Sequence, residues 1–213
     1  MLPRQVCYRC FKSLKTCYCR LINPFPTEVR FIILTHPLER RRATNSGRMA
    51  HLILSNSLWL EGATFAHDKR VNDIINAPQN SCFTLYPGPQ AITLGNAEAT
   101  SQLLNYSQHK EVFIFIIDGT WASSRKTIAT SPNLAKLPRL CLSPSKPSTF
   151  TIRRQPAPWC LSSIEAIYQV LNHLPETKGA AFRSRLLEVF HSMVSDQIRW
   201  EHQKSTSTLQ KTT

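Results

Sequence analysis

VFIFIIDGTW, residues 112–121, is the stretch that decides the fold. Residues 112–117 are all β-branched or aromatic, which predicts a strand buried on both faces. Strands of this kind occur in parallel sheets that are covered by helices on both sides. In such sheets ligands bind beyond the carboxyl ends of the strands. Asp118, Thr120 and Trp121 follow this strand directly, so we expect them to line a small-molecule site.

Strand-like and helix-like segments alternate on both sides of this run. Apolar runs predict further strands at residues 29–34, 62–66, 81–86 and 140–142, and helices are expected to begin near residues 46, 122, 162 and 182. In the first helix an apolar stripe is expected from Met49, Leu52, Ile53 and Leu60. The sequence therefore predicts an α/β fold with a largely parallel sheet and helices on both faces.

The composition is that of a globular protein. The chain has 213 residues, of which 42% are hydrophobic and 18% charged. This length is enough for one domain with a small appendage. We expect a cysteine-rich head over residues 1–28, a main domain over 29–202 and a disordered polar tail over 203–213. No apolar stretch is long enough to cross a membrane, and the N-terminus has no signal-peptide core, so a cytoplasmic location is expected.

Positive charge dominates the sequence. There are 26 Lys and Arg residues against 13 Asp and Glu, a formal net charge of +13. An excess of this size suits a polyanionic partner such as nucleic acid; the alternative is a basic surface with no specific partner. The arginines at 40–42 and 153–154 flank the loops that are expected to form the site.

Four cysteines are concentrated near the N-terminus, at Cys7, Cys10, Cys17 and Cys19. Their spacing, C-x2-C-x6-C-x-C, gives two close pairs that can supply the four thiolates of a structural zinc site. A reducing compartment argues against disulfides. The alternative is four free thiols in a mobile terminus. Aromatic and basic residues that suit RNA contact interleave with the cysteines, namely Tyr8, Arg9, Phe11, Lys12 and Lys15.

Two other loops are expected at the same edge of the sheet as Asp118. The first, residues 44–47, begins a helix whose free N–H groups can hold a carboxylate or phosphate, although Asn45 or Ser46 could equally be an ordinary cap. The second contains Arg153 and Arg154, which can contact an anion, and leads to a capping-box pattern, Ser162 with Glu165, which explains Glu165 without catalysis.

The residues of the DGTW stretch also allow structural interpretations. Asp118 could act as a general base, hold a ligand, or cap the following helix, and Trp121 could stack on a flat ring or belong to the core. Glycine-rich nucleotide motifs and a G-x-S-x-G elbow are absent from the sequence. Their absence leaves a dinucleotide Rossmann site, a P-loop and a hydrolase of the nucleophile-elbow type without support.

Five short motifs follow one another between about residue 5 and residue 200: the four cysteines, HPLE (36–39) with TNSG (44–47), YPG (86–88), DGTW (118–121), and RQP (154–156) with LSSIEA (161–166). Together they resemble the DTW-domain family, the tRNA-uridine aminocarboxypropyltransferases. The D-x-T-W signature is intact. Ser46 and Ser163 stand where the family is expected to have threonine, and both keep the hydroxyl group.

The resemblance implies a SPOUT-like, knotted core and S-adenosylmethionine as donor of an aminocarboxypropyl group to N3 of a uridine in tRNA. It implies catalytic roles for Asp118, Thr120 and Trp121, and donor contacts at Ser46, Ile117, Leu142 and Ser163. We expect RNA contacts at Arg40, Arg41, Arg42, Arg153 and Arg154, and structural zinc on the four cysteines. No protein partner is expected. A SPOUT-like RNA methyltransferase and a non-enzymatic zinc-bearing RNA-binding module are the alternatives.

Overall fold

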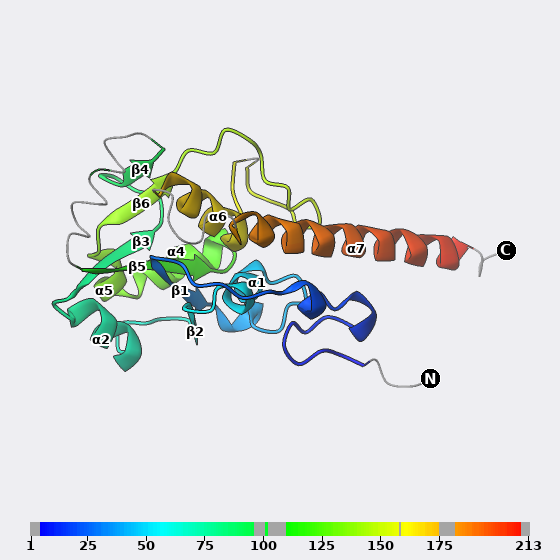
Figure 1. Cartoon of the computed structure of the whole chain (residues 1–213), viewed down its shortest axis with the longest axis horizontal. Coiled ribbons are helices and arrows are strands. Elements are labelled where there is room, and N and C mark those ends of the chain that lie inside the picture. Colours follow the sequence, from blue (N-terminus) through cyan, green and yellow to red (C-terminus); the bar gives the residue numbers. More distant parts are fainter. Residues whose placement is uncertain (1–4, 96–100, 102–109, 158, 175–181, 210–213) are drawn as a thin grey trace.

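A parallel sheet forms the centre of the structure, a computed structural model that describes residues 5–95, 101, 110–157, 159–174 and 182–209. Within these residues the sheet has six strands in the order β2-β1-β5-β3-β6-β4, and every neighbouring pair is parallel (Figure 1). The strands are β1 (Arg30–Thr35), β2 (Leu58–Glu61), β3 (Asn80–Leu85), β4 (Ile92–Leu94), β5 (Glu111–Asp118) and β6 (Arg139–Leu142). The predicted parallel α/β sheet is confirmed.

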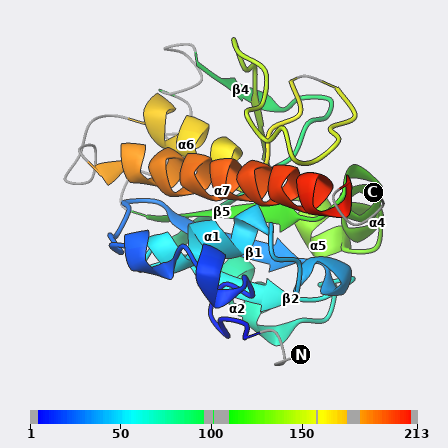
Figure 2. The same cartoon turned by 90° about the vertical axis from the view of Figure 1, so that its right-hand side faces the viewer.

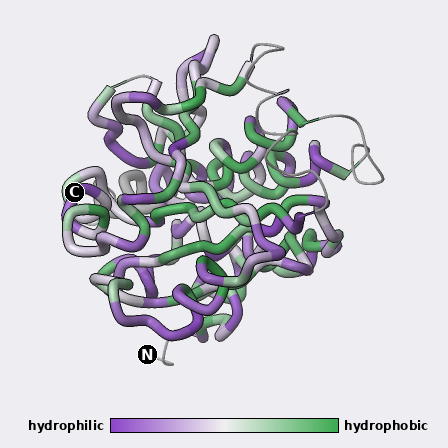
Figure 3. The backbone as a smooth tube through the Cα atoms, turned by 90° about the vertical axis from the view of Figure 1, so that its left-hand side faces the viewer, coloured by the Kyte–Doolittle hydropathy of each residue, from purple (hydrophilic) through white to green (hydrophobic). Residues whose placement is uncertain are grey.

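Both faces of the central strand β5 are buried. Ile114 and Ile116 point into one core cluster, and Phe113 and Phe115 point into a second cluster on the opposite face. Because successive side chains of a strand point to opposite faces, a strand covered on both sides must be apolar at every position. This is why the segment is a continuous hydrophobic run, and Figure 3 shows hydrophobic chain running through the middle of the molecule.

Helices cover both faces of the sheet, as predicted (Figures 1 and 2). The first core cluster contains apolar residues of α1 (Ser46–Ile53), α6 (Ser163–His173) and α7 (Ser184–Leu209). The second cluster contains those of α2 (Lys69–Asn76), α4 (Trp121–Ala129) and α5 (Pro132–Ala135). The chain between Leu142 and α6 contains no helix or strand among its described residues, so a long loop connects β6 to α6.

The predicted strand at 62–66 is wrong, and so is the inclusion of Leu60 in the first helix. α1 ends at Ile53 with Leu54 as its C-cap. The strand lies earlier, at β2, where Leu60 is paired with Leu34 of β1 and buried in the second core cluster. Pairing with β1 thus decides the conformation of a segment whose apolar spacing also suits a helix. The short strand β4 and the largely polar helix α2 gave no clear signal in the sequence.

The N-terminal head packs on the main domain rather than standing apart. It contains two short 3₁₀ helices, η1 (Leu14–Thr16) and η2 (Cys19–Leu21), and its Cys10 and Tyr18 belong to the first core cluster. The Nζ of Lys12, which is 2% exposed, donates to Gln197 Oε1 of α7 at 2.9 Å. In Figure 1 α7 extends away from the sheet above this head. α7 continues to Leu209, so residues 203–209 of the expected polar tail are helical, and 210–213 lie outside the described residues.

One glycine of α1 sets how closely this helix approaches β5. A Cβ atom at Gly47 would lie 2.6 Å from Oδ1 of Asp118, whose carboxylate is held in place by three hydrogen bonds. We therefore expect Gly47→Ala to lower the free energy of unfolding by about 2 kcal/mol, the usual cost of overpacking. Urea denaturation measures this change.

Gly88→Ala is the matched control, because there the added methyl group would meet the flexible end of the Arg139 side chain. This control should change stability by less than about 1 kcal/mol. Equal effects of the two substitutions would contradict the close packing of α1 on Asp118.

Candidate active site

A cavity of about 600 Å³ lies at the carboxyl ends of β5, β3 and β6. Its walls are the ends of these strands, the first residues of α1 and α6, and the long loop after β6. A volume of this size suits a small-molecule ligand. The sequence-predicted residues that line it are Ser46, Ile117, Asp118, Thr120, Trp121, Leu142, Arg153, Arg154 and Ser163. Arg40, Arg41 and Arg42 are not part of its lining.

The Asp118 carboxylate joins three other segments. Its Oδ2 accepts hydrogen bonds from Thr35 Oγ1 of β1 at 3.0 Å and from Asn45 Nδ2 at 2.7 Å. Its Oδ1 accepts one from Ser163 Oγ of α6 at 2.7 Å. Asp118 is 4% exposed, so these bonds replace water as its solvation. A carboxylate has about four acceptor positions, which leaves room for one further donor.

The structure excludes the helix-cap interpretation of Asp118 and the core interpretation of Trp121. The N-cap of α4 is Thr120, whose side chain accepts from the N–H of Ser123 at 3.1 Å. Trp121 is the first residue of α4, is 37% exposed and lies beside Tyr86 at a ring separation of 6.5 Å. Trp121 therefore presents an aromatic surface to the cavity.

The N-termini of α1 and α6 meet at the cavity. Asn45 caps α1, and the N–H of Ser163 donates to Ser46 Oγ at 3.2 Å. The predicted capping box of Ser162 and Glu165 is confirmed. Glu165 also accepts hydrogen bonds from Ser148 and Thr149. It therefore fixes the long loop to α6 and has a structural role.

Three of the five predicted RNA-binding arginines are engaged in ion pairs. Arg42 and Arg153 both contact Oε1 of Glu39, at 3.4 and 3.1 Å, and Arg40 contacts Glu61 at 3.0 Å. Arg41 and Arg154 are exposed and form no salt bridge with any described residue. These two guanidinium groups are therefore the ones best able to contact an anion.

Sequence reasoning missed several residues of the site. Glu39, at the end of η3 (Pro37–Glu39), is 2% exposed and pairs with arginines from two loops. The HPLE motif contained this residue, but nothing in its spacing indicated burial. Trp159, 66% exposed, also lines the cavity. It lies in a proline-rich loop whose path the sequence pattern does not indicate.

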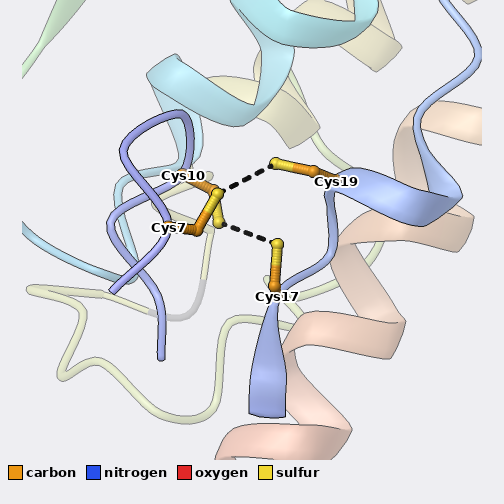
Figure 4. Close-up of side chains that lie close together, drawn as sticks. All are labelled: Cys7, Cys10, Cys17 and Cys19. Atoms are coloured by element: carbon orange, nitrogen blue, oxygen red, sulfur yellow. Dashed lines mark hydrogen bonds between the residues drawn. The ribbon is translucent and has the colours of Figure 1, made fainter. Parts of the chain in front are cut away.

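The four N-terminal cysteines converge, as Figure 4 shows. Their Sγ atoms all lie within 4.8 Å of one another, with 3.8 Å between Cys7 and Cys19 and 3.6 Å between Cys10 and Cys17. Four sulfurs bound tetrahedrally to zinc would be about 3.8 Å apart, because each Zn–S bond is about 2.3 Å. The thiols are not joined in disulfides. This donor set fits a structural metal.

The thiols differ in their readiness to ionise. Burial alone would raise the pKa of Cys7, but hydrogen bonds from the backbone N–H groups of Cys10 and Arg9, and from neighbouring thiols, lower it to about 6. Burial raises the pKa of Cys10 to about 11 and also raises that of Cys19. Because its pKa is lowered to about 6, Cys7 can begin metal binding as a thiolate at neutral pH.

The residues between the cysteines divide into exposed and buried groups. Tyr8 is 90% exposed and available to a partner. Lys12 is buried against α7, so its predicted suitability for RNA contact is wrong. Phe11 packs on the guanidinium group of Arg48 instead of entering the core, at 4.3 Å from the ring centroid.

A family profile described as the DTW domain matches residues 4–198. The chain belongs to the DTW-domain family. The match includes both the cysteine head and the cavity, so the DTW domain occupies nearly the whole chain. No solved structure shows a significant match.

Curated relatives of this DTW domain are named tRNA-uridine aminocarboxypropyltransferases. The tRNA-uridine aminocarboxypropyltransferase 2 of Drosophila melanogaster is 27% identical over 206 residues, and the match covers 92% of this chain and 76% of the relative. The Mus musculus protein of the same name is also 27% identical, and the match covers 92% of this chain and 64% of the relative. The tRNA-uridine aminocarboxypropyltransferase A of Arabidopsis thaliana is 22% identical, and the match covers 92% of this chain and 82% of the relative. The chain thus spans slightly under two thirds of the mouse protein.

Asp118 should tolerate asparagine better than alanine. In Asp118→Asn the amide oxygen can still accept from Thr35 and Asn45, while its NH₂ group donates to Ser163, whose hydroxyl turns to accept. Asp118→Ala leaves these three donors without their acceptor, at about 1–3 kcal/mol for each one that water cannot reach. We expect urea denaturation to show a loss of more than about 3 kcal/mol for alanine, and clearly less for asparagine. Equal losses would contradict the role of Asp118 as a shared acceptor.

Zinc binding to the four cysteines should release protons. At pH 7 Cys10 and Cys19 are protonated because their pKa values are raised, and a zinc ligand must be a thiolate. Each zinc ion should therefore displace at least two protons, and affinity should increase as pH rises. Titration calorimetry of chelator-treated protein in buffers of different ionisation enthalpy gives the proton count.

Cys82→Ser is the control for this titration, because burial likewise raises the pKa of Cys82, to about 11, but it lies outside the cluster. It should leave both affinity and proton count unchanged. Release of fewer than one proton per zinc would contradict binding by the four thiolates.

Proposed function

We propose that this DTW domain transfers the 3-amino-3-carboxypropyl group of S-adenosylmethionine to N3 of a uridine in tRNA. The observation that carries the proposal is the cavity at the carboxyl ends of the strands, where the DTW residues lie beside the N-termini of two helices. The names of the curated relatives support the transfer of an aminocarboxypropyl group to a uridine of tRNA, and the donor and the N3 position are our proposal.

The cavity has a wall for each part of this donor. Ile117 and Leu142 offer backbone and apolar surface to the adenosine portion, and the aromatic rings of Trp121 and Tyr86 can contact a flat base. Ser46 and Ser163 provide hydroxyl groups at helix N-termini. Arg154 lines the cavity and forms no salt bridge with any described residue, so it suits the carboxylate of the transferred arm.

The reaction needs no further activation of the donor, because its sulfur already carries a positive charge. The uracil N3 attacks the methylene carbon of the arm next to sulfur. The C–S electron pair returns to sulfur, which leaves as neutral methylthioadenosine, and the N3 proton must be accepted. The enzyme selects one of three electrophilic carbons by orientation. Asp118 has room for one more donor, and we propose that it receives the N3–H group there.

The acceptor RNA is proposed to bind over the basic surface. The net charge of +13 attracts the phosphate backbone without regard to sequence. Arg41 and Arg154 are the predicted contacts with free charge, whereas Arg40, Arg42 and Arg153 hold the loops in place through Glu61 and Glu39. Exposed Trp159 and Tyr8 offer rings for unstacked bases.

We also propose structural zinc on the four cysteines and a cytoplasmic location, where the thiols stay reduced. Among the described residues no helix has the length and apolar character needed to cross a bilayer.

A knotted, SPOUT-like core remains part of the proposal. β5 lies between β1 and β3 in the sheet, although both of these strands precede it in the sequence. This strand order supports a backbone path with crossing connections.

Nucleoside mass spectrometry tests this function. The zinc-loaded protein is incubated with unmodified tRNA and S-adenosylmethionine, and the digested nucleosides are compared with a sample lacking protein. We expect a uridine that has gained an aminocarboxypropyl group, together with methylthioadenosine. A methylated uridine would support the methyltransferase alternative, and absence of donor binding by calorimetry would support the RNA-binding module. Either outcome would overturn the proposal.

Asp118→Asn serves as the active-site variant in this assay. It should bind the donor and lose most turnover, because an amide cannot accept the N3 proton. Asp73→Asn on α2, an exposed carboxylate paired with Lys69, is the matched control and should retain full turnover. Full turnover by Asp118→Asn would limit Asp118 to holding the loops together.

A further inference from the structure

Arg48 is a buried cation that has no carboxylate partner in the described part of the chain. It lies on α1, is 9% exposed, and belongs to none of the salt bridges among the described residues. Burying an unpaired charge is costly unless other groups replace its hydration. The surroundings of Arg48 therefore indicate what the residue is for.

The Arg48 guanidinium group contacts three different segments of the chain. Its Cζ atom lies 4.3 Å from the ring centroid of Phe11 and 4.2 Å from that of Trp59. Its Nη1 donates to the carbonyl of Arg9 at 3.2 Å, and its Nη2 donates to the carbonyl of Arg40 at 3.0 Å. Arg48 thus joins the cysteine head to the basic loop, defined here as residues 37–42.

The contacts of Arg48 with the head depend on the turn that carries the first two cysteines. The N–H of Phe11 donates to the carbonyl of Cys7 at 2.8 Å, and the backbone of Phe11 has a positive φ of 56°. A phenylalanine seldom adopts this conformation unless its surroundings impose it. The turn that brings Cys7 and Cys10 together therefore also places Phe11 over Arg48.

On the other side, contacts lead from Arg48 to the cavity. Trp59 Nε1 donates to Thr35 Oγ1 at 2.5 Å, and the same hydroxyl group donates to Asp118 at 3.0 Å. Asp118 also has Asn45 and Ser163 as partners. A change at Arg48 should therefore disturb the basic loop, where one carbonyl depends on it directly, more than the Asp118 carboxylate.

We propose that Arg48 is a positioning residue that couples metal occupancy of the cysteine head to RNA binding by the basic loop. When the head is loaded, Phe11 and the Arg9 carbonyl hold the guanidinium group in place, and it in turn fixes the Arg40 carbonyl next to Arg41. When the metal leaves, these contacts loosen and Arg41 is no longer held for a phosphate. This inference rests on the proposed binding of zinc and tRNA.

Such coupling must act in both directions, because binding free energies are linked. If zinc tightens tRNA binding by some factor, tRNA must tighten zinc binding by the same factor. We expect a factor of about ten, within the usual range for coupled sites. Zinc should change the affinity for S-adenosylmethionine less than about twofold. Even if the hydrogen bond from Thr35 is disturbed through Trp59, Asn45 and Ser163 still hold the Asp118 carboxylate.

The experiment compares wild type, Arg48→Met, Arg48→Lys and Arg30→Met, each with and without zinc. Arg30 is the control: it is an exposed arginine on β1 whose guanidinium group lies 5.1 Å from the Phe113 ring and forms an ion pair with Glu111. Fluorescence anisotropy gives the tRNA affinity, calorimetry gives the donor affinity, and a chromogenic chelator gives the zinc affinity with and without tRNA. None of these readouts depends on turnover.

We expect zinc to tighten tRNA binding about tenfold in wild type and Arg30→Met. It should have no effect in Arg48→Met, whose tRNA affinity should equal that of zinc-free wild type. Arg48→Lys keeps the charge but cannot stack on both rings while reaching both carbonyls, so it should behave like Arg48→Met. If one variant fails to fold, the other still gives the comparison.

Three results would overturn the inference while leaving the proposed function intact. They are tRNA binding by wild type that is independent of zinc, full coupling in either Arg48 variant, and a loss of donor affinity on zinc removal as large as the loss of tRNA affinity. Failure of the zinc-loaded wild type to bind tRNA at all would refute the proposed function, and this inference with it.

Discussion

The Asp118 carboxylate is the interaction on which the arrangement of the site depends. It stands at the end of the central strand and accepts hydrogen bonds from β1, from the residue that caps α1 and from the first residue of α6. Hydrogen bonds to a charged acceptor are roughly twice as strong as those between neutral groups. β1, α1 and α6 are thus held together at one buried carboxylate. Gly47 makes this possible because it has no side chain where the carboxylate lies.

Two other buried charges organise the loops around this centre. Glu39 binds Arg42 and Arg153, and so connects the basic loop to the long loop that borders the cavity. Arg48 binds carbonyls and aromatic rings, and so connects the same loop to the cysteine head. A strongly basic sequence therefore contains arginines of two kinds. Some build the site, and others, such as Arg41 and Arg154, form no salt bridge with any described residue and can contact an anionic ligand.

The sequence was most informative where local chemistry decides the structure. The run at 112–117 formed the predicted strand buried on both faces, and the capping box at Ser162 and Glu165 formed as its pattern predicted. Sequence reasoning failed where pairing between strands decided the outcome. Leu60 fitted a helical stripe but became part of β2, because β1 offered it an unpaired parallel edge.

The sequence by itself determined the α/β class, the parallel sheet, the cysteine cluster and the strand end at which the cavity lies. These features follow from side-chain periodicity and from the spacing of chemically distinctive residues, which act over a few neighbouring positions. The tertiary structure alone decided that Asp118 is a shared acceptor, that Glu39 and Arg48 are buried, and which arginines stay unpaired. Those properties depend on contacts between different segments of the chain, such as Asp118 with Ser163 and Glu39 with Arg153. Such contacts exist only when the sheet has brought the strand ends together.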